Sequence, residues 1–407
     1  MEKIQTVTGG VTAAKGFRAA GGFAGIGKNA GKGDIALIVS DVPGSAAAVY
    51  TKNKVKAAHI AVTKDHIQDG IGQAVICNSG NANTCTANGV EIAEKECALA
   101  GKLTGIDPKN VFPAATGVIG VPLTFEPFEK AIPKLVENLS EDGSSAAGKA
   151  ILTTDTYKKE YAVQFIIDGK TVTLGGIAKG SGMIHINMGT MLCFLTTDLA
   201  ISHEMLQKAL SEEIIDSFNQ VSVDGDTSTN DTVSIIANGL AGNPEITEEG
   251  PDYDLFCEAL HQVSVYMSKK IAGDGEGCTK LLEAHVTGAP EKETARLVAK
   301  SVICSSLFKA AVFAADANWG RILCAIGYTP ADFDASDITV SITSKKGTVL
   351  VCEHSAAVAF DEDLAANVMG EEAVTVEIDL HDGDQEAYGW GCDLTYDYVK
   401  INGSYRS

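Results

Sequence analysis

The chain has 407 residues, of which 45% are hydrophobic and 21% are charged, so it can bury a large core and is not disordered as a whole. Aspartate and glutamate number 53 against 32 lysines and arginines, which gives a formal net charge of −21 at pH 7. A field of that sign repels phosphate backbones and anionic lipids, and it therefore argues against nucleic-acid and membrane partners.

Apolar runs alternate with helical patterns along the chain, which predicts a mixed α/β fold. The elements predicted in the first half are, in order, a strand at 34–39, a strand at 73–77, a helix at 86–103 and a helix at 125–139. Pro133 is expected to kink or break the last of these helices. Residues 161–167 and 171–177 are then expected to pair as a hairpin around the turn Asp168-Gly169.

A strongly apolar strand is predicted at 190–196, followed by a helix that Ser202 caps and that runs to about Phe218. The elements predicted after it are helices at 255–270 and 292–305 and strands at 338–343, 348–352 and 374–380. Composition gives no sharp domain boundary. We place one near residue 280, so that a main layered domain over 1–280 is followed by a smaller C-terminal domain over 281–407.

Ten cysteines are spread along the chain without a Cys-x-x-Cys pair, and no histidine pair has zinc-site spacing, so no metal site is expected. Aliphatic or small neighbours flank most of them, as is typical of reduced thiols inside a cytoplasmic protein. The N-terminal segment MEKIQTVTGG does not have the pattern of a signal peptide, and no apolar run approaches the roughly 18 residues of a membrane span.

A first glycine cluster occupies residues 21–33. Gly22-x-x-x-x-Gly27-Lys28 resembles a phosphate-binding loop, although Asn29 stands where serine or threonine must hold magnesium. The segment from Gly25 also fits the looser dinucleotide fingerprint. Both motifs need a strand before the loop and a helix after it, whereas the clearest predicted strand follows this loop. We therefore interpret it as a loop that leads into that strand and keep phosphate binding as an alternative.

A second glycine cluster, residues 175–189, runs directly into the apolar strand that begins at Thr190. Glycine allows tight backbone turns, so the Gly189–Thr190 peptide is expected to be accessible and easily distorted. The Thr190 hydroxyl would then lie at the mouth of a strand, where a nucleophile can be held rigidly. The local pattern alone favours a tight loop followed by a strand-initiating threonine.

Two acidic loops follow. Residues 224–231 imitate the start of a calcium loop, but Thr229 replaces the required glycine and Ile235 replaces the final glutamate, so calcium binding is rejected and side-chain-capped turns are expected. Asp274-Gly-Glu276-Gly places a carboxylate in another tight turn, where it either has a structural role or binds a substrate.

Several short segments, in order along nearly the whole chain, resemble the ornithine acetyltransferase family, also called the arginine-biosynthesis glutamate N-acetyltransferases. Each segment is weak by itself, but their common order is specific. The segments are Gly80-Asn-Ala-Asn83, Thr116-Gly-Val-Ile-Gly120, Thr153-Thr-Asp155, Ala178-Lys-Gly-Ser-Gly-Met-Ile-His185, Asp224–Asp231, Asp274-Gly-Glu-Gly277, Asn318-Trp-Gly-Arg321, Trp390-Gly-Cys-Asp393 and Asn402.

The resemblance implies an Ntn-hydrolase-like αββα sandwich with a smaller C-terminal α/β domain. It also implies that the chain cuts itself between Gly189 and Thr190, which leaves an α chain of 1–189 and a β chain of 190–407. Thr190 would then carry both the nucleophilic hydroxyl and a new α-amine that accepts its proton, since an α-amine titrates near pH 8. The assembly implied by the family is an α2β2 heterotetramer, and no cofactor is expected.

The activity implied by the resemblance is acetyl transfer from N2-acetyl-L-ornithine to L-glutamate, through an acetyl-Thr190 ester and with ping-pong kinetics. The family's oxyanion hole corresponds to Thr116 and Gly117. Its substrate-binding positions correspond, besides Thr190, to Thr153, Lys179, Glu276, Asn402 and Ser407, with Thr154 as an alternative to Thr153. Lys179 suits a substrate carboxylate and Glu276 suits an ammonium group. Whether acetyl-CoA also serves as a donor is not decided by any residue.

The chain departs from the family pattern at Ile186, where proline is usual, at Gly189, where alanine is usual, and at Lys309-Ala-Ala311, where Lys-Thr-Ala is usual. The changes at Ile186 and Gly189 put the rate of self-cleavage in question. An amidase or aminopeptidase of the same superfamily, with water in place of glutamate, is the main alternative. A non-catalytic protein that binds phosphate at Gly22–Lys28 is the third.

Overall fold

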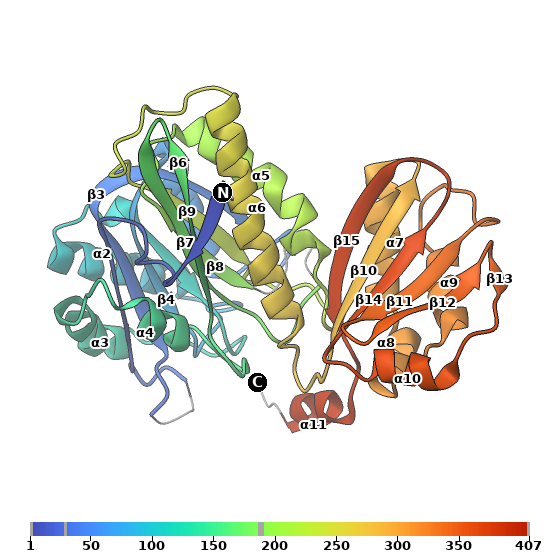
Figure 1. Cartoon of the computed structure of the whole chain (residues 1–407). Coiled ribbons are helices and arrows are strands. Elements are labelled where there is room, and N and C mark those ends of the chain that lie inside the picture. Colours follow the sequence, from blue (N-terminus) through green and yellow to red (C-terminus); the bar gives the residue numbers. More distant parts are fainter. Residues whose placement is uncertain (1–2, 28–30, 186–190, 405–407) are drawn as a thin grey trace.

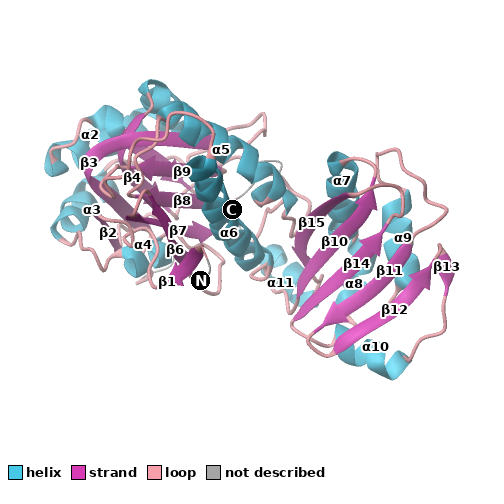
Figure 2. Cartoon of the chain, turned by 45° about the horizontal axis from the view of Figure 1, so that its top comes forward, coloured by secondary structure: helices cyan, strands magenta, loops and turns pink. Residues whose placement is uncertain are grey.

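The computed structural model describes residues 3–27, 31–185 and 191–404, and its described residues form two β-sheets with helices around them (Figures 1 and 2). The strands are β1 (Ile4–Val7), β2 (Phe17–Gly22), β3 (Ile35–Tyr50), β4 (Ile71–Asn78), β5 (Val111–Ala115), β6 (Lys159–Ile167), β7 (Lys170–Lys179), β8 (Leu192–Thr197), β9 (Thr232–Ala237), β10 (Leu281–Ala289), β11 (Thr339–Ser344), β12 (Gly347–Glu353), β13 (Ala356–Ala357), β14 (Ala373–Asp379) and β15 (Gln385–Cys392).

The helices lie between these strands in a mixed order. They are α1 (Ala58–His66), α2 (Gly89–Thr104), α3 (Glu126–Glu137), α4 (Ser144–Ala150), α5 (His203–Asp216), α6 (Pro251–Ala272), α7 (Lys292–Cys304), α8 (Ser306–Phe313), α9 (Trp319–Gly327), α10 (Glu362–Met369) and α11 (Tyr396–Ser404). In the described part of the chain, no helix is long and apolar enough to cross a bilayer.

The first sheet has the order β1-β6-β7-β8-β9-β3-β4-β5, with β2 also paired to β3. Strand β3 is 16 residues long and pairs with different strands along its two halves. Its first half pairs with β2 and β4, its second half pairs with β9, and its register with β4 shifts between Val39 and Gly44. A side chain at Gly44 would lie 2.2 Å from the Ala237 carbonyl oxygen, so glycine allows the close approach to β9. The sheet therefore folds over at this strand into two layers.

The inner faces of the two layers pack against each other. One buried cluster joins side chains of β2 to β5 with side chains of β7 to β9, among them Phe17, Ile38 and Phe112 from the first group and Ile177 and Phe194 from the second. Helices α5 and α6 cover the outer face of the β6 to β9 layer, and α1 to α3 cover the outer face of the other. This is an αββα arrangement, as the family resemblance implies.

The second sheet has the order β13-β12-β11-β14-β10-β15, and helices α7 to α10 pack on one of its faces (Figure 2). It starts at Leu281, while the exact division of the chain near residue 280 stays a prediction. Helix α11 returns toward the turn that follows α6, where the Thr395 hydroxyl donates to the Gly277 carbonyl oxygen at 2.7 Å (Figure 1). The C-terminal end of the described chain is thereby brought to the main domain.

Except for the strand predicted at 34–39, the predicted elements are observed with small changes at their ends. Asp168 and Gly169 have φ angles of 47° and 72°, as a tight hairpin turn between β6 and β7 requires. Ser202 caps α5, since its hydroxyl accepts the Met205 N–H at 3.3 Å. The strand predicted at 34–39 is the first part of the much longer β3. Helix α3 continues through Pro133, so the break considered there is absent.

The first glycine cluster does not form a phosphate-binding loop in its described part. It leaves β2 at Gly22 and enters β3 directly, so the helix that the motif needs does not follow. The Asp34 carboxylate accepts the N–H groups of Ala24, Ile26 and Gly27 at 2.6, 2.7 and 3.0 Å, which would otherwise be available to a phosphate. Residues 28–30 lie outside the described residues. The interpretation as a loop that feeds a strand is confirmed.

Candidate active site

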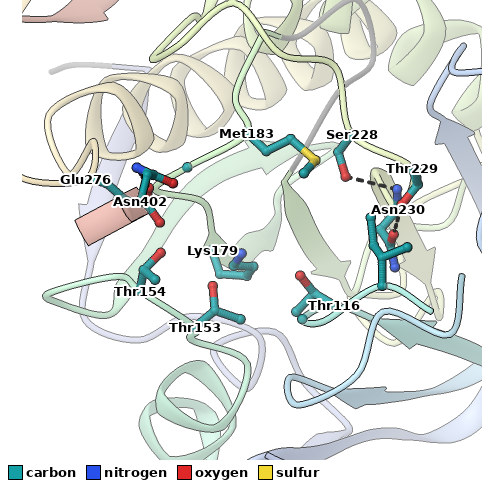
Figure 3. A pocket seen from close by; sticks show the side chains of 13 residues that line it. Thr116, Thr153, Thr154, Lys179, Met183, Ser228, Thr229, Asn230, Glu276 and Asn402 are labelled. Atoms are coloured by element: carbon teal, nitrogen blue, oxygen red, sulfur yellow. Dashed lines mark hydrogen bonds between the residues drawn. The ribbon is translucent and has the colours of Figure 1, made fainter. Parts of the chain in front are cut away.

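A pocket lies at one end of the folded sheet, where loops from distant parts of the chain meet (Figure 3). It is lined by Thr116, Gly117, Ile119, Thr153, Thr154, Lys179, Gly182, Met183, Ser228, Thr229, Asn230, Glu276 and Asn402. Strands β5 and β7 end at this pocket, β9 begins beside it, α4 and α6 each lead into a lining loop, and α11 covers one side.

The Thr116–Gly117 pair follows the buried strand β5. The Thr116 N–H donates to the Asn78 carbonyl oxygen at 2.9 Å, which ties the residue to the end of β4. Gly117 has a φ of 129°, and a side chain there would lie 2.6 Å from the backbone carbon of Gly80, so only glycine fits. Within the described residues, neither the Thr116 hydroxyl nor the Gly117 N–H has a hydrogen-bond partner, which leaves both donors available to a ligand.

Lys179 is the last residue of β7, and its side chain points into the middle of the pocket (Figure 3). It is 3% exposed, and its ammonium forms no hydrogen bond or ion pair among the described residues. Its charge still acts on Asp155: burial opposes ionisation of that carboxyl, but the ammonium groups of Lys179 and Lys159 hold the pKa of Asp155 well below its usual range. Lys179 is therefore a buried cation that can pair with an anionic group of a ligand.

Glu276 and Asn402 lie together on one side of the pocket (Figure 3). The Asn402 amide donates to Glu276 Oε2 at 2.7 Å and to the Tyr398 carbonyl oxygen at 3.1 Å. The Glu276 N–H donates to the Ser181 carbonyl oxygen at 3.0 Å, which joins its turn to the loop after β7. A side chain at Gly182 would lie 2.4 Å from Glu276 Oε2, so the carboxylate packs directly against the Gly182 backbone. Glu276 can pair with a cationic group of a ligand.

The acidic loop at 224–231 has structural contacts on both sides of the pocket. Asp224 accepts the N–H groups of Met183 and Ile184 at 2.6 and 2.8 Å and so fixes the loop after β7. The Asn230 amide donates to the carbonyl oxygens of Ala82 and Ala115 at 2.6 and 2.8 Å. The loop thus holds the two groups of pocket residues together, a role wider than the capped turns that the sequence predicts.

Gly189, Thr190, Ile186 and Ser407 lie outside the described residues. After this gap the chain is described from Met191 onward. The Met191 N–H donates to Asp231 Oδ1 at 2.5 Å. Burial raises the pKa of the Asp231 carboxyl well above its usual range. Leu192 then pairs with Lys179 across β7 and β8, so the residues that follow Thr190 run directly beside the pocket lysine.

The described residues predicted for the site come together in this one pocket. They are Thr116, Gly117, Thr153, Lys179, Glu276 and Asn402. Thr154 lines the pocket as well, so the choice between the two threonines stays open. Ile119, Gly182, Met183 and Ser228 to Asn230 were not predicted as site residues. They belong to three of the segments that carry the family resemblance, namely Thr116–Gly120, Ala178–His185 and the acidic loop. The resemblance gave these residues no individual role.

One cluster away from the pocket has side chains that metals use. Asp65, His66 and Glu94 offer ligand atoms within 4.8 Å of one another. However, Lys109 Nζ pairs with Asp65 Oδ2 at 2.6 Å, and His66 Nε2 faces Glu94 Oε2 at 3.3 Å. These groups are satisfied by each other, and nothing else in the described chain points to an ion there.

Comparison with known proteins matches residues 18–407 to the ArgJ family. The arginine biosynthesis bifunctional protein ArgJ of Symbiobacterium thermophilum is 50% identical over 406 residues, 99% of this chain and 100% of that protein. The arginine biosynthesis bifunctional protein ArgJ 1 of Clostridium acetobutylicum is 48% identical over 93% of each chain. A solved chain of Mycobacterium tuberculosis ornithine acetyltransferase, complexed with ornithine, is 33% identical, with a TM-score of 0.41 over 44% of this chain and 96% of its own.

Proposed function

This chain belongs to the ArgJ family of arginine-biosynthesis enzymes, and from that premise we propose that it transfers an acetyl group from N2-acetyl-L-ornithine to L-glutamate. The observation that carries the proposal is the pocket itself. The same cavity is lined by the buried ammonium of Lys179, the Glu276 carboxylate and the Thr116–Gly117 donors, and among the described residues neither the ammonium nor these donors have a partner. Amino-acid substrates carry the complementary charges, and acyl transfer needs the unused donors.

The nucleophile of this proposal is the Thr190 hydroxyl. We infer that the Gly189–Thr190 peptide is cut first, because an internal threonine has no adjacent amine to take its proton. After the cut, the α-amine of Thr190 serves as the base, since part of it is neutral near pH 7. The buried Asp231, which holds the Met191 N–H, would keep this new chain start fixed beside the pocket.

In the first half-reaction, Thr190 Oγ attacks the acetyl carbonyl of N2-acetyl-L-ornithine. Negative charge develops on the carbonyl oxygen, and the Thr116 hydroxyl and Gly117 N–H donate to it. The C–N bond then breaks, the departing amine takes the proton held by the α-amine, and an acetyl-Thr190 ester remains. In the second half-reaction, the neutral amine of L-glutamate attacks the ester carbonyl and gives a proton to the α-amine of Thr190. The bond between the acetyl carbon and Thr190 Oγ then breaks, Oγ takes that proton back, and N-acetyl-L-glutamate leaves.

Recognition in this scheme depends on charge. Lys179 pairs with the substrate carboxylate, Glu276 with a substrate ammonium, and Asn402 holds Glu276 in place. Thr153 or Thr154 and the terminal Ser407 complete the contacts. The groups needed for the chemistry are side chains, the Gly117 N–H and the chain start, so the proposal includes no cofactor. It further assigns the enzyme to the cytoplasm as an α2β2 heterotetramer.

The proposal is tested by supplying purified protein with N2-acetyl-L-ornithine and L-glutamate. We expect N-acetyl-L-glutamate and ornithine in equal amounts, with parallel double-reciprocal plots when both substrates are varied. Release of free acetate without glutamate would instead identify an amidase, because water would then be the acceptor. A parallel assay with acetyl-CoA and L-glutamate decides whether acetyl-CoA is also a donor.

Replacing Gly182 with alanine tests the role of Glu276 without changing a charged residue. The new methyl group would lie 2.4 Å from Glu276 Oε2, so the carboxylate must move away from its position beside Asn402. We expect KM for N2-acetyl-L-ornithine to rise about 10- to 100-fold, because the substrate loses one charge-assisted hydrogen bond. The change in kcat should be smaller. The matched control is Gly169→Ala in the hairpin turn, far from the pocket, where the melting temperature falls but KM stays constant.

A further inference from the structure

A network of buried charges lies directly beneath the pocket. Lys159 Nζ pairs with Asp155 Oδ1 at 2.7 Å and with Asp274 Oδ2 at 2.6 Å. The side chains of Lys159 and Asp155 are 0% exposed and that of Asp274 is 2% exposed. Lys179 lies beside Asp155, so the network contains two ammonium groups and two carboxylates. Buried charges are costly unless they are paired in this way.

The two lysines reach this network from opposite faces of the sheet. Lys159 begins β6 and pairs with Ala178 of β7, so these residues share a face. Lys179 follows Ala178, and its side chain therefore points to the other face, toward the pocket. Asp155 lies at the end of both strands, where its carboxylate binds Lys159 and faces Lys179. A residue outside the pocket is thereby connected to the pocket cation.

Each carboxylate of the network also fixes a loop that lines the pocket. Asp155 accepts the N–H groups of Gly180 and Thr153 at 2.7 and 3.1 Å. Asp274 accepts the Thr156 N–H at 3.1 Å, and its carbonyl oxygen accepts the Ser181 hydroxyl at 2.7 Å. Asp274 is separated from Glu276 by a single residue, so its position determines where the Glu276 turn begins.

We propose that Lys159 is a positioning residue for the acetyl transfer: by bridging Asp155 and Asp274, it sets the spacing between Lys179 and Glu276. It does not touch substrate. The inference rests on the function proposed above and deepens it, because this spacing must match the α-carboxylate and the δ-ammonium of N2-acetyl-L-ornithine. Loss of the bridge leaves the Thr116–Gly117 donors in place but separates the two charges that bind the substrate, so binding suffers more than turnover.

The test uses a charge-balanced pair of substitutions. Lys159→Met alone leaves two buried carboxylates facing one cation and threatens folding. The double variant Lys159→Met with Asp274→Asn removes one charge of each sign, and the asparagine oxygen can still accept the Thr156 N–H. We expect its KM for N2-acetyl-L-ornithine to rise at least ~10-fold while kcat stays within ~3-fold and the melting temperature stays close to that of the wild type.

Lys158→Met is the matched control. Lys158 neighbours Lys159 in sequence but pairs with Glu160 at 2.5 Å near the surface, outside the network. We expect its KM values to equal those of the wild type. A calorimetric titration of each processed enzyme with L-ornithine adds a readout that needs no turnover, and the double variant should bind at least ~10-fold more weakly than the control.

The outcomes separate this inference from the proposed function. If the wild type transfers acetyl and the double variant folds with unchanged KM and ornithine affinity, Lys159 does not position the site. A fall in kcat at constant KM overturns the inference as well, because the bridge would then act on the chemical step. If the wild type itself transfers no acetyl group, the proposed function fails, whereas a weaker ornithine affinity in the double variant still supports the role of Lys159.

Discussion

Replacing Thr190 with alanine should give a single uncut chain of 42.4 kDa with no acetyl transfer. In the proposed mechanism the Thr190 hydroxyl attacks the preceding peptide and, later, the acetyl carbonyl, so the substitution removes the nucleophile of both cutting and transfer. We expect wild-type protein to show two fragments, 1–189 and 190–407, by intact mass spectrometry. Activity of the variant should fall by at least ~10⁴-fold, as in other enzymes that lose a covalent nucleophile.

Thr190→Ser is the matched control, because it keeps the hydroxyl and should still be cut. N-terminal sequencing of the larger fragment, 190–407, should begin at the substituted residue. Full activity in a wild-type chain that is still joined at Gly189–Thr190 would contradict the mechanism, since the α-amine that serves as base exists only after the cut.

Thr116→Ala should lower kcat by ~10²–10³-fold, with little change in KM. In the proposed mechanism the hydroxyl donates to the oxygen on which charge develops, so its interaction would be strongest in the transition state, whereas the ground-state carbonyl would gain little from it. The position tolerates a smaller side chain, since Thr116 is fixed by its backbone N–H to Asn78 and not by its hydroxyl. Steady-state kinetics with both substrates measures the effect.

Thr116→Ser keeps the donor and should retain most of the turnover, while Thr116→Val keeps the shape and should behave like the alanine variant. A valine variant with wild-type kcat would remove the hydroxyl from the mechanism. The Gly117 N–H would then be the remaining donor of the pair, and it cannot be tested by a side chain because none fits there.

The turns and helix caps that depend on a few neighbouring residues could be predicted from the sequence. The Asp168-Gly169 turn and the Ser202 cap follow from backbone preferences of those residue types. Strand β3 was predicted too short because Pro43 and Gly44 are typical of a turn, whereas here they lie in the irregular part of a continuous strand. Helix α1 was missed because residues that it buries, His59 and His66 among them, are polar and leave no apolar stripe.

Residues that line the pocket could be predicted from the sequence, but the buried residues that hold them in place could not. The order of short segments indicated Thr116, Lys179 and Glu276, which the fold brings to one pocket. The bridge from Lys159 to Asp155 and Asp274 was not predictable, because it joins residues 115 positions apart and depends on how β6 meets the turn after α6. A lone lysine at the start of a strand carries no signal of that kind.

The strand order explains why cutting the chain would leave the molecule whole. Strands β8 and β9 follow residue 190, yet they lie in the middle of the folded sheet, between β7 on one side and β3 on the other, both of which precede it. Ladders of backbone hydrogen bonds flank the inserted pair on both sides. The two products of the proposed cut would thus be interlocked, and neither could complete the sandwich by itself, so separately produced halves would have to fold around each other.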